Sequence, residues 1–218
     1  LGRPHPRHHR RLDIHIMTAT EPRRVTGADR IARLLTTVFA PAHLVIGLLL
    51  LVGAASHLSR VTGLAWGALA ALLVGVVPYA WVLYAVRRGR FTSRHIPERA
   101  QRLLPLAVAA AAALVGLGVL VVVGGPRQLV VLVLAMLIGL VVVGVITKYW
   151  KVSLHTAVAG GTSAILALVL GPTLLSTALV VVGVGWSRVH IRDHTVLQTL
   201  VGGLLGATVA VAVFASLR

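Results

Sequence analysis

Long apolar runs separated by short charged loops make up most of this chain. An α-helix needs roughly 20 mostly apolar residues to cross the hydrocarbon core of a membrane. Five runs meet this requirement, at about residues 37–57, 64–86, 103–124, 127–147 and 194–216. We therefore expect a membrane-spanning helix in each of these segments.

A further apolar stretch, residues 155–187, is interrupted by Gly171-Pro172. A single helix of about 30 residues would be roughly 45 Å long at 1.5 Å per residue, which exceeds the thickness of the hydrocarbon core. Glycine followed by proline is typical of a turn where a helix ends. Two short helices that double back at this dipeptide are therefore the favoured interpretation. The alternative, one kinked helix, would place His155 and His194 at opposite membrane faces.

The composition agrees with a membrane protein, because 57% of the residues are hydrophobic and only 12% are charged. We expect an all-α polytopic membrane helix bundle with six to seven transmembrane helices over residues 37–218. Residues 1–36 are basic and lack apolar periodicity, so we expect a cytoplasmic tail without stable structure. Because Met17 begins a more ordinary N-terminal sequence, residues 1–16 are interpreted as an upstream extension.

The formal net charge of +16 is carried by loops between the apolar runs, where cations set membrane orientation and meet anionic headgroups. Nucleic acid is therefore not an expected partner, whereas membrane lipids are. With seven spans, all but three of the 21 Lys and Arg residues fall in loops on one side. The exceptions are Arg60, Arg127 and Arg218. By the positive-inside rule the basic side is cytoplasmic.

The chain contains no cysteine, which excludes disulfides and thiolate metal sites. We expect neither a metal ion nor a cofactor. His43 lies inside the first apolar run, and a buried, hydrogen-bonded structural role is expected for it.

The polar residues that interrupt the apolar pattern between 148 and 198 predict the functional site. Ser153-Leu154-His155 opens one predicted helix, and Asp193-His194 stands just before another. Unpaired N–H groups and a partial positive charge at helix N-termini attract anions. The nearby cations that would add full charges are Lys148, Lys151 and Arg188. Such a cluster can position and neutralise a phosphoryl group without a metal ion.

At these residues the chain resembles the type 2 phosphatidic acid phosphatase superfamily, the lipid phosphate phosphatases related to vanadium haloperoxidases. The family pattern has three parts, KxxxxxxRP, PSGH and SRxxxxxHxxxD. Ser187-Arg188, five residues and His194 match the third part, except that Gln198 replaces its aspartate. The segment 152–155 keeps the serine and histidine of the second part without its proline and glycine.

The first part of the family pattern is matched only by spacing, at Arg87 and Arg94, and His95 follows where the family has proline. Lys148 or Lys151 is an alternative source of the missing cation. The combination of matches and departures is similar to a divergent prokaryotic branch of the superfamily, which implies a bacterial plasma membrane.

The resemblance implies that His194 is a nucleophile that forms a phosphohistidine and that His155 is the general acid. Gln198 would accept a hydrogen bond from the His194 ring without supplying negative charge; Asp193 is an alternative partner. The implied ligands of the phosphate oxygens are Arg188, Ser153, Lys151, Lys148, Arg94 and Arg87.

The function expected from this resemblance is hydrolysis of a lipid phosphate or polyprenyl (di)phosphate at the cytoplasmic interface. A second hypothesis is a catalytically silent family member that binds or moves an anionic lipid; Gln198 and the missing glycine favour it. A small-molecule transporter is a third hypothesis, although the sequence has no internal repeat and no charged residue at mid-membrane depth.

Overall fold

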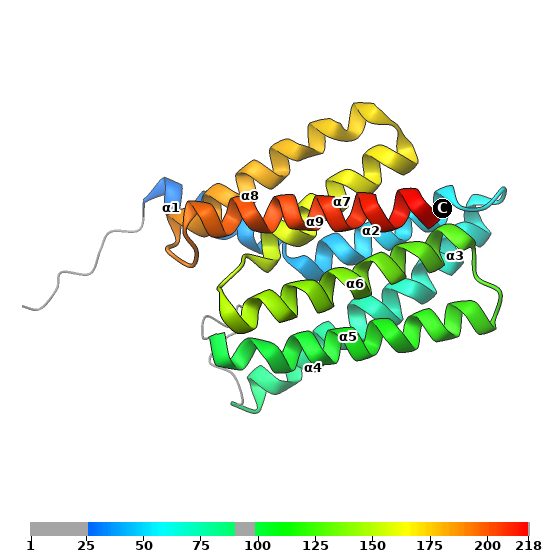
Figure 1. Ribbon diagram of the computed structural model, residues 1–218, viewed down its shortest axis with the longest axis horizontal. Coiled ribbons are helices and arrows are strands. Elements are labelled where there is room, and N and C mark those ends of the chain that lie inside the picture. Colours follow the sequence, from blue (N-terminus) through cyan, green and yellow to red (C-terminus); the bar gives the residue numbers. More distant parts are fainter. Residues whose placement is uncertain (1–25, 90–98, 218) are drawn as a thin grey trace, which may run out of the picture.

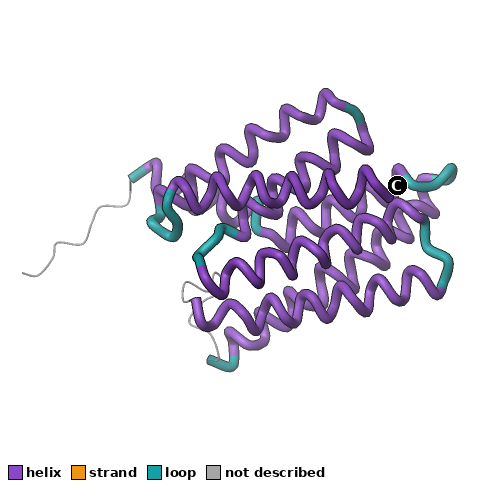
Figure 2. Tube along the Cα trace, viewed as in Figure 1, coloured by secondary structure: helices purple, strands orange, loops and turns teal. Residues whose placement is uncertain are grey.

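The computed structural model of the protein describes residues 26–89 and 99–217, and the regular structure in these ranges is entirely helical (Figures 1 and 2). The elements in chain order are α1 (Gly27–Val38), α2 (Pro41–Ala55), α3 (Arg60–Ala71), η1 (Leu72–Val76), α4 (Val77–Arg87), α5 (Arg99–Val122), α6 (Arg127–Tyr149), α7 (Leu154–Leu170), η2 (Pro172–Thr177), α8 (Ala178–His190) and α9 (Val196–Leu217). The all-α prediction is confirmed for the described part of the chain.

Five helical segments among the described residues are long and apolar enough to cross a membrane. They are Arg60–Arg87, which joins α3, η1 and α4, then Leu103–Val122, Arg127–Tyr149, Pro172–His190 and Val196–Leu217. The bent pair α1 and α2 makes a sixth if it is counted as one span, whereas α7 is shorter. Long apolar helices thus occupy four of the five predicted runs.

The first predicted run differs from the expectation, because its helix is broken. Helices α1 and α2 meet at an angle of 47°. Pro41 is the first residue of α2, and a proline ring prevents the preceding residue from continuing a helix. The break between α1 and α2 is therefore explained by Pro41.

The predicted unstructured tail is wrong for residues 27–36, which belong to α1. A capping box begins this helix: Thr26 Oγ1 accepts a hydrogen bond from the Asp29 N–H, and the Asp29 carboxylate accepts one from the Thr26 N–H. Helix α1 packs against α8. Residues 1–25 of the predicted tail lie outside the described residues.

The predicted hairpin is confirmed. Helix α7 ends at Leu170, and Gly171 adopts φ = +115°, a conformation that is accessible to glycine and unfavourable for other residues. The short helix η2 then leads into α8, which returns alongside α7 (Figure 1). Because α8 ends where α7 begins, the one-helix alternative is wrong.

Helices α7 and α9 run parallel and pack closely because glycines line their contact. A Cβ atom added at Gly160 would overlap the carbonyl oxygen of Gly203, and one added at Gly206 would overlap that of Ala157. Small residues allow helix backbones to approach in this way in membranes. The close approach brings the first turns of α7 and α9 together.

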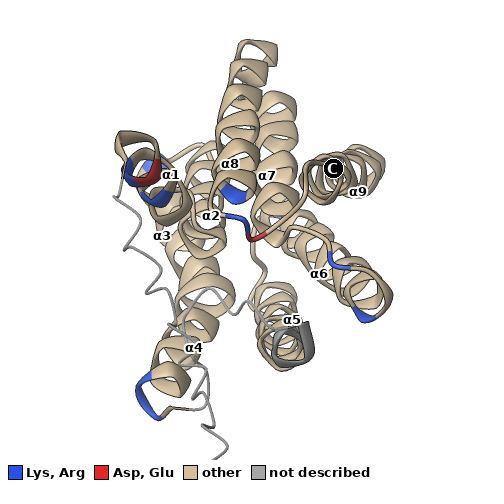
Figure 3. Cartoon of the chain, turned by 90° about the vertical axis from the view of Figure 1, so that its left-hand side faces the viewer, with Lys and Arg blue, Asp and Glu red and all other residues tan. Residues whose placement is uncertain are grey.

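Basic residues gather at one end of the bundle. The start of α1 and the C-terminal ends of α4, α6 and α8 lie at this end, where Figure 3 marks Lys and Arg positions in blue on the ribbon. Helices α3 and α6, which begin at Arg60 and Arg127, start at the opposite end (Figure 1). The described basic loops therefore share one end, as the alternation of loops predicted.

Candidate active site

A cavity of about 330 Å³ lies between α2, α4, α5, α6, α7 and α9. The two histidines and the arginine singled out by the sequence, His155, Arg188 and His194, all line it. Each of the three side chains is at most 8% exposed. Most of the remaining lining consists of apolar side chains. The fold therefore brings the predicted nucleophile, general acid and principal phosphate ligand to one pocket.

The hairpin and the α7–α9 contact place His155. It is the second residue of α7, whose N-cap is Ser153. The Ser153 hydroxyl accepts a hydrogen bond from the Thr156 N–H at 3.4 Å, and the Ser153 N–H donates to the carbonyl oxygen of Gln198 at 3.2 Å. The first turn of α7 is thus tied to the first turn of α9, close to His194.

Ser153 has a different position from the one implied for a phosphate ligand. Its side chain is fully buried and caps α7. It is not among the described residues that line the cavity. Because its hydroxyl accepts a helix N–H, one of the orphan donors at this N-terminus is already satisfied.

The turn after α8 places His194 over Arg188. The carbonyl oxygen of Arg188 accepts the Asp193 N–H at 3.0 Å and the His194 N–H at 3.2 Å, and that of Val189 accepts the Arg192 N–H at 2.9 Å. Arg192 has φ = 61°. These features form a Schellman motif, in which a left-handed residue closes the end of a helix. The spacing of Arg188 and His194 is therefore a consequence of how α8 ends.

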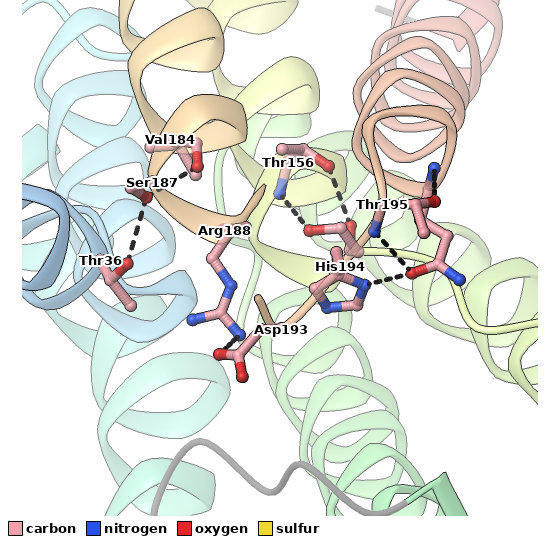
Figure 4. Close-up of polar contacts among 10 residues, drawn as sticks. Thr36, Thr156, Val184, Ser187, Arg188, Asp193, His194 and Thr195 are labelled. Carbon is pink, nitrogen blue, oxygen red and sulfur yellow. Dashed lines mark hydrogen bonds and ion pairs between the residues drawn. The ribbon is translucent and has the colours of Figure 1, made fainter. Parts of the chain in front are cut away.

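Asp193 pairs with Arg188, not with His194. Nη2 of Arg188 lies 2.6 Å from Oδ2 of Asp193 (Figure 4). The arginine side chain is 2% exposed, and a buried charge requires a partner of opposite charge. The alternative in which Asp193 is the partner of the His194 ring is thus not the arrangement in the structure.

The predicted hydrogen bond between His194 and Gln198 is confirmed. Nδ1 of His194 lies 3.2 Å from Oε1 of Gln198 (Figure 4). The same oxygen accepts the Thr195 N–H at 3.2 Å, while Thr195 Oγ1 accepts the Gln198 N–H at 3.3 Å. Thr195 and Gln198 therefore form a capping box at the start of α9.

This capping box determines the tautomer of His194. A backbone N–H can only donate, so the Gln198 atom that faces the Thr195 N–H is the amide oxygen. An amide oxygen only accepts, so Nδ1 of His194 carries the proton that it donates to Gln198. In the neutral ring, Nε2 then carries the lone pair. This is the form that a nucleophilic imidazole requires.

The other implied phosphate ligands lie differently. Lys148 is exposed in the last turn of α6, with its ammonium 5.8 Å from the Tyr149 ring centroid. Lys151 is half-buried in the connection to α7, and Arg87 is exposed at the end of α4. None of these three is among the described residues that line the cavity. Arg94 lies outside the described residues.

Five polar residues that the motif did not contain also line the cavity: Thr37, His43, Tyr79, Thr147 and Thr162. Nδ1 of His43 donates to the carbonyl oxygens of Thr37 and Val38 at 3.0 and 3.2 Å. His43 is exposed, not buried as expected. Its hydrogen bonds cap the end of α1 at the bend. The only sequence signal for these residues was a polar side chain inside or at the end of an apolar run.

The described residues contain no group of three or more His, Cys, Asp or Glu side chains that could hold a metal ion. Comparison of the chain with protein-family models, with curated proteins and with solved structures finds no match. The case for a function therefore rests on the residues and geometry described above.

Proposed function

We propose that the protein is a membrane phosphatase of the type 2 phosphatidic acid phosphatase kind, which hydrolyses a lipid phosphate or polyprenyl (di)phosphate without a metal ion. One observation carries the proposal: His155, Arg188 and His194 line a single cavity whose remaining walls are mostly apolar. Such a pocket suits a ligand with an anionic headgroup and a hydrocarbon chain. A histidine nucleophile, a histidine acid and a buried arginine are the groups that metal-free phosphoryl transfer needs.

In the first step, Nε2 of His194 attacks phosphorus and the bond from phosphorus to the substrate oxygen breaks. His155 donates a proton to that departing oxygen. Arg188 stabilises the charge on the equatorial phosphoryl oxygens. Oε1 of Gln198 accepts a hydrogen bond from the Nδ1–H of His194 throughout, which keeps the lone pair on the attacking nitrogen.

In the second step, His155 removes a proton from water, and the water oxygen attacks the phosphorus of the phosphohistidine. The bond between phosphorus and Nε2 of His194 breaks. Inorganic phosphate leaves, His194 regains its lone pair and His155 regains its proton. The two steps together consume one water molecule and leave the enzyme unchanged.

The proposal includes a six- to seven-span topology in a bacterial plasma membrane with the basic end of the bundle at the cytoplasmic face. Two features support it: the clustering of cations at one end (Figure 3) and the apolar helices that connect the two ends. In this placement α1 lies at the interface with Arg30 and Arg33 exposed. The headgroup of a cytoplasmic-leaflet lipid would then reach His194 directly.

A catalytically silent lipid-binding protein is the second candidate, and Gln198 favours it. The neutral Gln198 stabilises a charged imidazole less than an aspartate would, which weakens formation of a phosphohistidine more than binding of an anionic headgroup. The Arg188–Asp193 pair favours neither candidate, because the aspartate neutralises the arginine that would hold the phosphate in both.

The deciding experiment measures phosphate release from a panel of lipid phosphates and polyprenyl phosphates by the purified full chain in the presence of chelator. We expect release by the wild type and a loss of at least about 10³-fold in His194→Ala. His190→Ala is the matched control, because His190 is not among the residues that line the cavity. Equal release by wild type and His194→Ala would overturn the assignment of the nucleophile. Binding of these lipids without phosphate release would identify the silent alternative.

A further inference from the structure

The cavity lining can be divided by chemistry. We call its polar end the part lined by His155, Arg188 and His194. We call its apolar arm the part lined by Leu132, Met136 and Gly139 from α6, Ile165 from α7, and Val209 and Ala210 from α9. The mechanism uses only the polar end, so the arm needs an explanation of its own.

The arm extends at least as far along the helices as the depth of one membrane leaflet. Along α7, the distance from His155 to Ile165 is roughly 15 Å at 1.5 Å per residue. Along α6, the distance from Thr147 to Leu132 is roughly 22 Å on the same basis. Half of the hydrocarbon core of a membrane is about 15 Å thick. A chain attached to a headgroup at the polar end would therefore lie along the arm inside the bundle.

Gly139 keeps the arm open. A Cβ atom added there would meet only Cγ1 of Val209, at 4.0 Å. Helix packing thus does not require glycine at this position, unlike Gly160 and Gly206, where an added Cβ would overlap backbone atoms. Glycine destabilises a helix interior relative to alanine. Its effect at residue 139 is to leave space between α6 and Val209 of α9.

We propose that the apolar arm holds the single hydrocarbon chain of the phosphorylated substrate and that Gly139 and Val209 set the chain length that the enzyme accepts. This inference rests on the proposed function, because it identifies the substrate of the same site. A volume of about 330 Å³ is near the lower end of the range of small-molecule sites. It suits one chain better than the two acyl chains of a diacyl lipid. The substrate class is therefore a single-chain alkyl or prenyl phosphate.

The test compares kcat/KM for butyl, octyl and dodecyl phosphate, each below its micellar concentration, with the full chain in detergent. In the wild type we expect kcat/KM to rise with chain length. In Gly139→Leu, the ratio of kcat/KM for dodecyl phosphate to that for butyl phosphate should fall at least tenfold. Val209→Phe, which fills the same space from α9, should lower the ratio as well.

Gly144→Leu is the matched control. It lies on the same helix, has nothing within 4 Å of an added Cβ and is not among the residues that line the cavity. Its chain-length ratio should equal that of the wild type. A ratio in Gly139→Leu and Val209→Phe equal to that of Gly144→Leu would overturn the proposal, as would a diacyl phosphate preferred over dodecyl phosphate.

A binding measurement separates this inference from the proposed function. Dodecylphosphonate, which is not hydrolysed, is titrated into wild type, Gly139→Leu and Gly144→Leu. Native mass spectrometry then measures how many dodecylphosphonate molecules each protein binds. We expect at least tenfold weaker binding in Gly139→Leu alone. If binding weakens in this way but the wild type hydrolyses none of the phosphates, the proposed phosphatase activity is wrong and the chain-binding role of the apolar arm stands. If the wild type hydrolyses the phosphates but all three proteins bind dodecylphosphonate equally, the phosphatase activity stands and the chain-binding role of the apolar arm is wrong.

Discussion

Nδ1 of His194 and Oε1 of Gln198 lie 3.2 Å apart, and this oxygen also accepts the Thr195 N–H. One amide oxygen therefore closes the capping box of α9 and holds the imidazole in a single tautomer. Glutamine is suited to both tasks because its side chain reaches back over the first helical turn. Under the proposed function, Gln198 would thus supply the orienting part of the role that the resemblance implies for an aspartate, without its negative charge.

Replacing Gln198 by leucine should lower kcat by about 10- to 100-fold, because a hydrogen bond to a group that becomes charged contributes about 1.5–3 kcal/mol. Thr195→Ala is the matched control. It removes the other half of the same capping box, at about 1 kcal/mol of stability, but keeps the Thr195 backbone N–H and the Gln198 side chain. Steady-state kinetics and thermal unfolding of both variants separate the effect on the orientation of the His194 ring from the effect on the stability of the fold. Equal kcat values in the two variants would contradict the orienting role.

Gln198→Glu should preserve the capping box and restore a negative charge beside His194. We expect kcat to rise about tenfold, equivalent to about 1.4 kcal/mol of transition-state stabilisation. A carboxylate favours the protonated imidazole, so the acidic limb of the pH–rate profile should move to higher pH. A profile unchanged in both height and position would exclude contact between residue 198 and the reacting histidine during turnover.

Arg192 is the non-glycine residue of the described chain with a positive φ. The left-handed conformation costs an L-residue roughly 1 kcal/mol, and glycine avoids this cost. We expect Arg192→Gly to stabilise the protein by about 0.5–1 kcal/mol, measured as a higher melting temperature. Arg192→Ala loses the same charge at the end of α8 but keeps a Cβ atom, so it should show no such gain. Equal melting temperatures for the two variants would show that the turn is not strained.

The sequence predicted some features of the site and not others. The placement of His155 and His194 in one cavity followed from one local signal, the Gly171-Pro172 turn, and the bond to Gln198 followed from helical spacing. Ser153 was assigned to the phosphate by the resemblance, but a serine hydroxyl can also serve as a helix N-cap. Only the fold shows which of these two roles its buried hydroxyl takes. A motif match therefore identified the right segment without fixing the role of each member.

The parts that the sequence did not predict depend on tertiary contacts. Helix α1 was missed because its charged residues resemble a tail, although Thr26 and Asp29 have the spacing of a capping box. The turn at Arg192 lacks the glycine that usually marks a Schellman motif. The cavity lining contributed by α2, α4 and α5 could not be predicted either, since no local pattern indicates which helices of a bundle become neighbours.

The contact between α1 and α8 should weaken in strong acid. Hydrogen bonds from the Thr26 backbone, the Thr26 hydroxyl and His190 lower the pKa of Asp29 from 3.8 to about 2. Asp29 lies in the first turn of α1, ahead of the apolar run, and its Oδ1 is 2.9 Å from Nε2 of His190. Because the pKa is lowered in the folded protein, the stabilisation is present above about pH 4 and is lost as the pH falls toward 2.

Trp186 reports on this contact, since its ring stacks on His190 at a centroid distance of 5.1 Å. In a protein with Trp186 as its single tryptophan, the fluorescence should change between about pH 4 and 2. Asp29→Asn should lack this transition. Asp193→Asn, which alters the other described ion-paired aspartate, should retain it. A transition between pH 4 and 2 that persists in Asp29→Asn would contradict the assignment to Asp29.

The close contact of α7 and α9 should be the least tolerant part of the fold. A Cβ atom at Gly206 would overlap the carbonyl oxygen of Ala157, and backbone atoms cannot rotate away as a side chain can. Gly206→Ala should therefore cost at least about 1–3 kcal/mol. Because the same contact holds the Ser153 N–H to Gln198, it should also lower phosphate release.

Gly144→Ala is the matched control for this change, because nothing lies within 4 Å of its added Cβ. Alanine is favoured over glycine in a helix interior by about 0.5–1 kcal/mol, so this variant should melt at or above the wild-type temperature. Gly206→Ala should then have both a lower melting temperature in detergent and a lower rate of phosphate release than Gly144→Ala. If Gly206→Ala melts as the wild type does yet loses activity, the contact positions the site without stabilising the bundle. If neither property changes, α7 and α9 are farther apart than the overlap requires, and the placement of His155 beside His194 needs another cause.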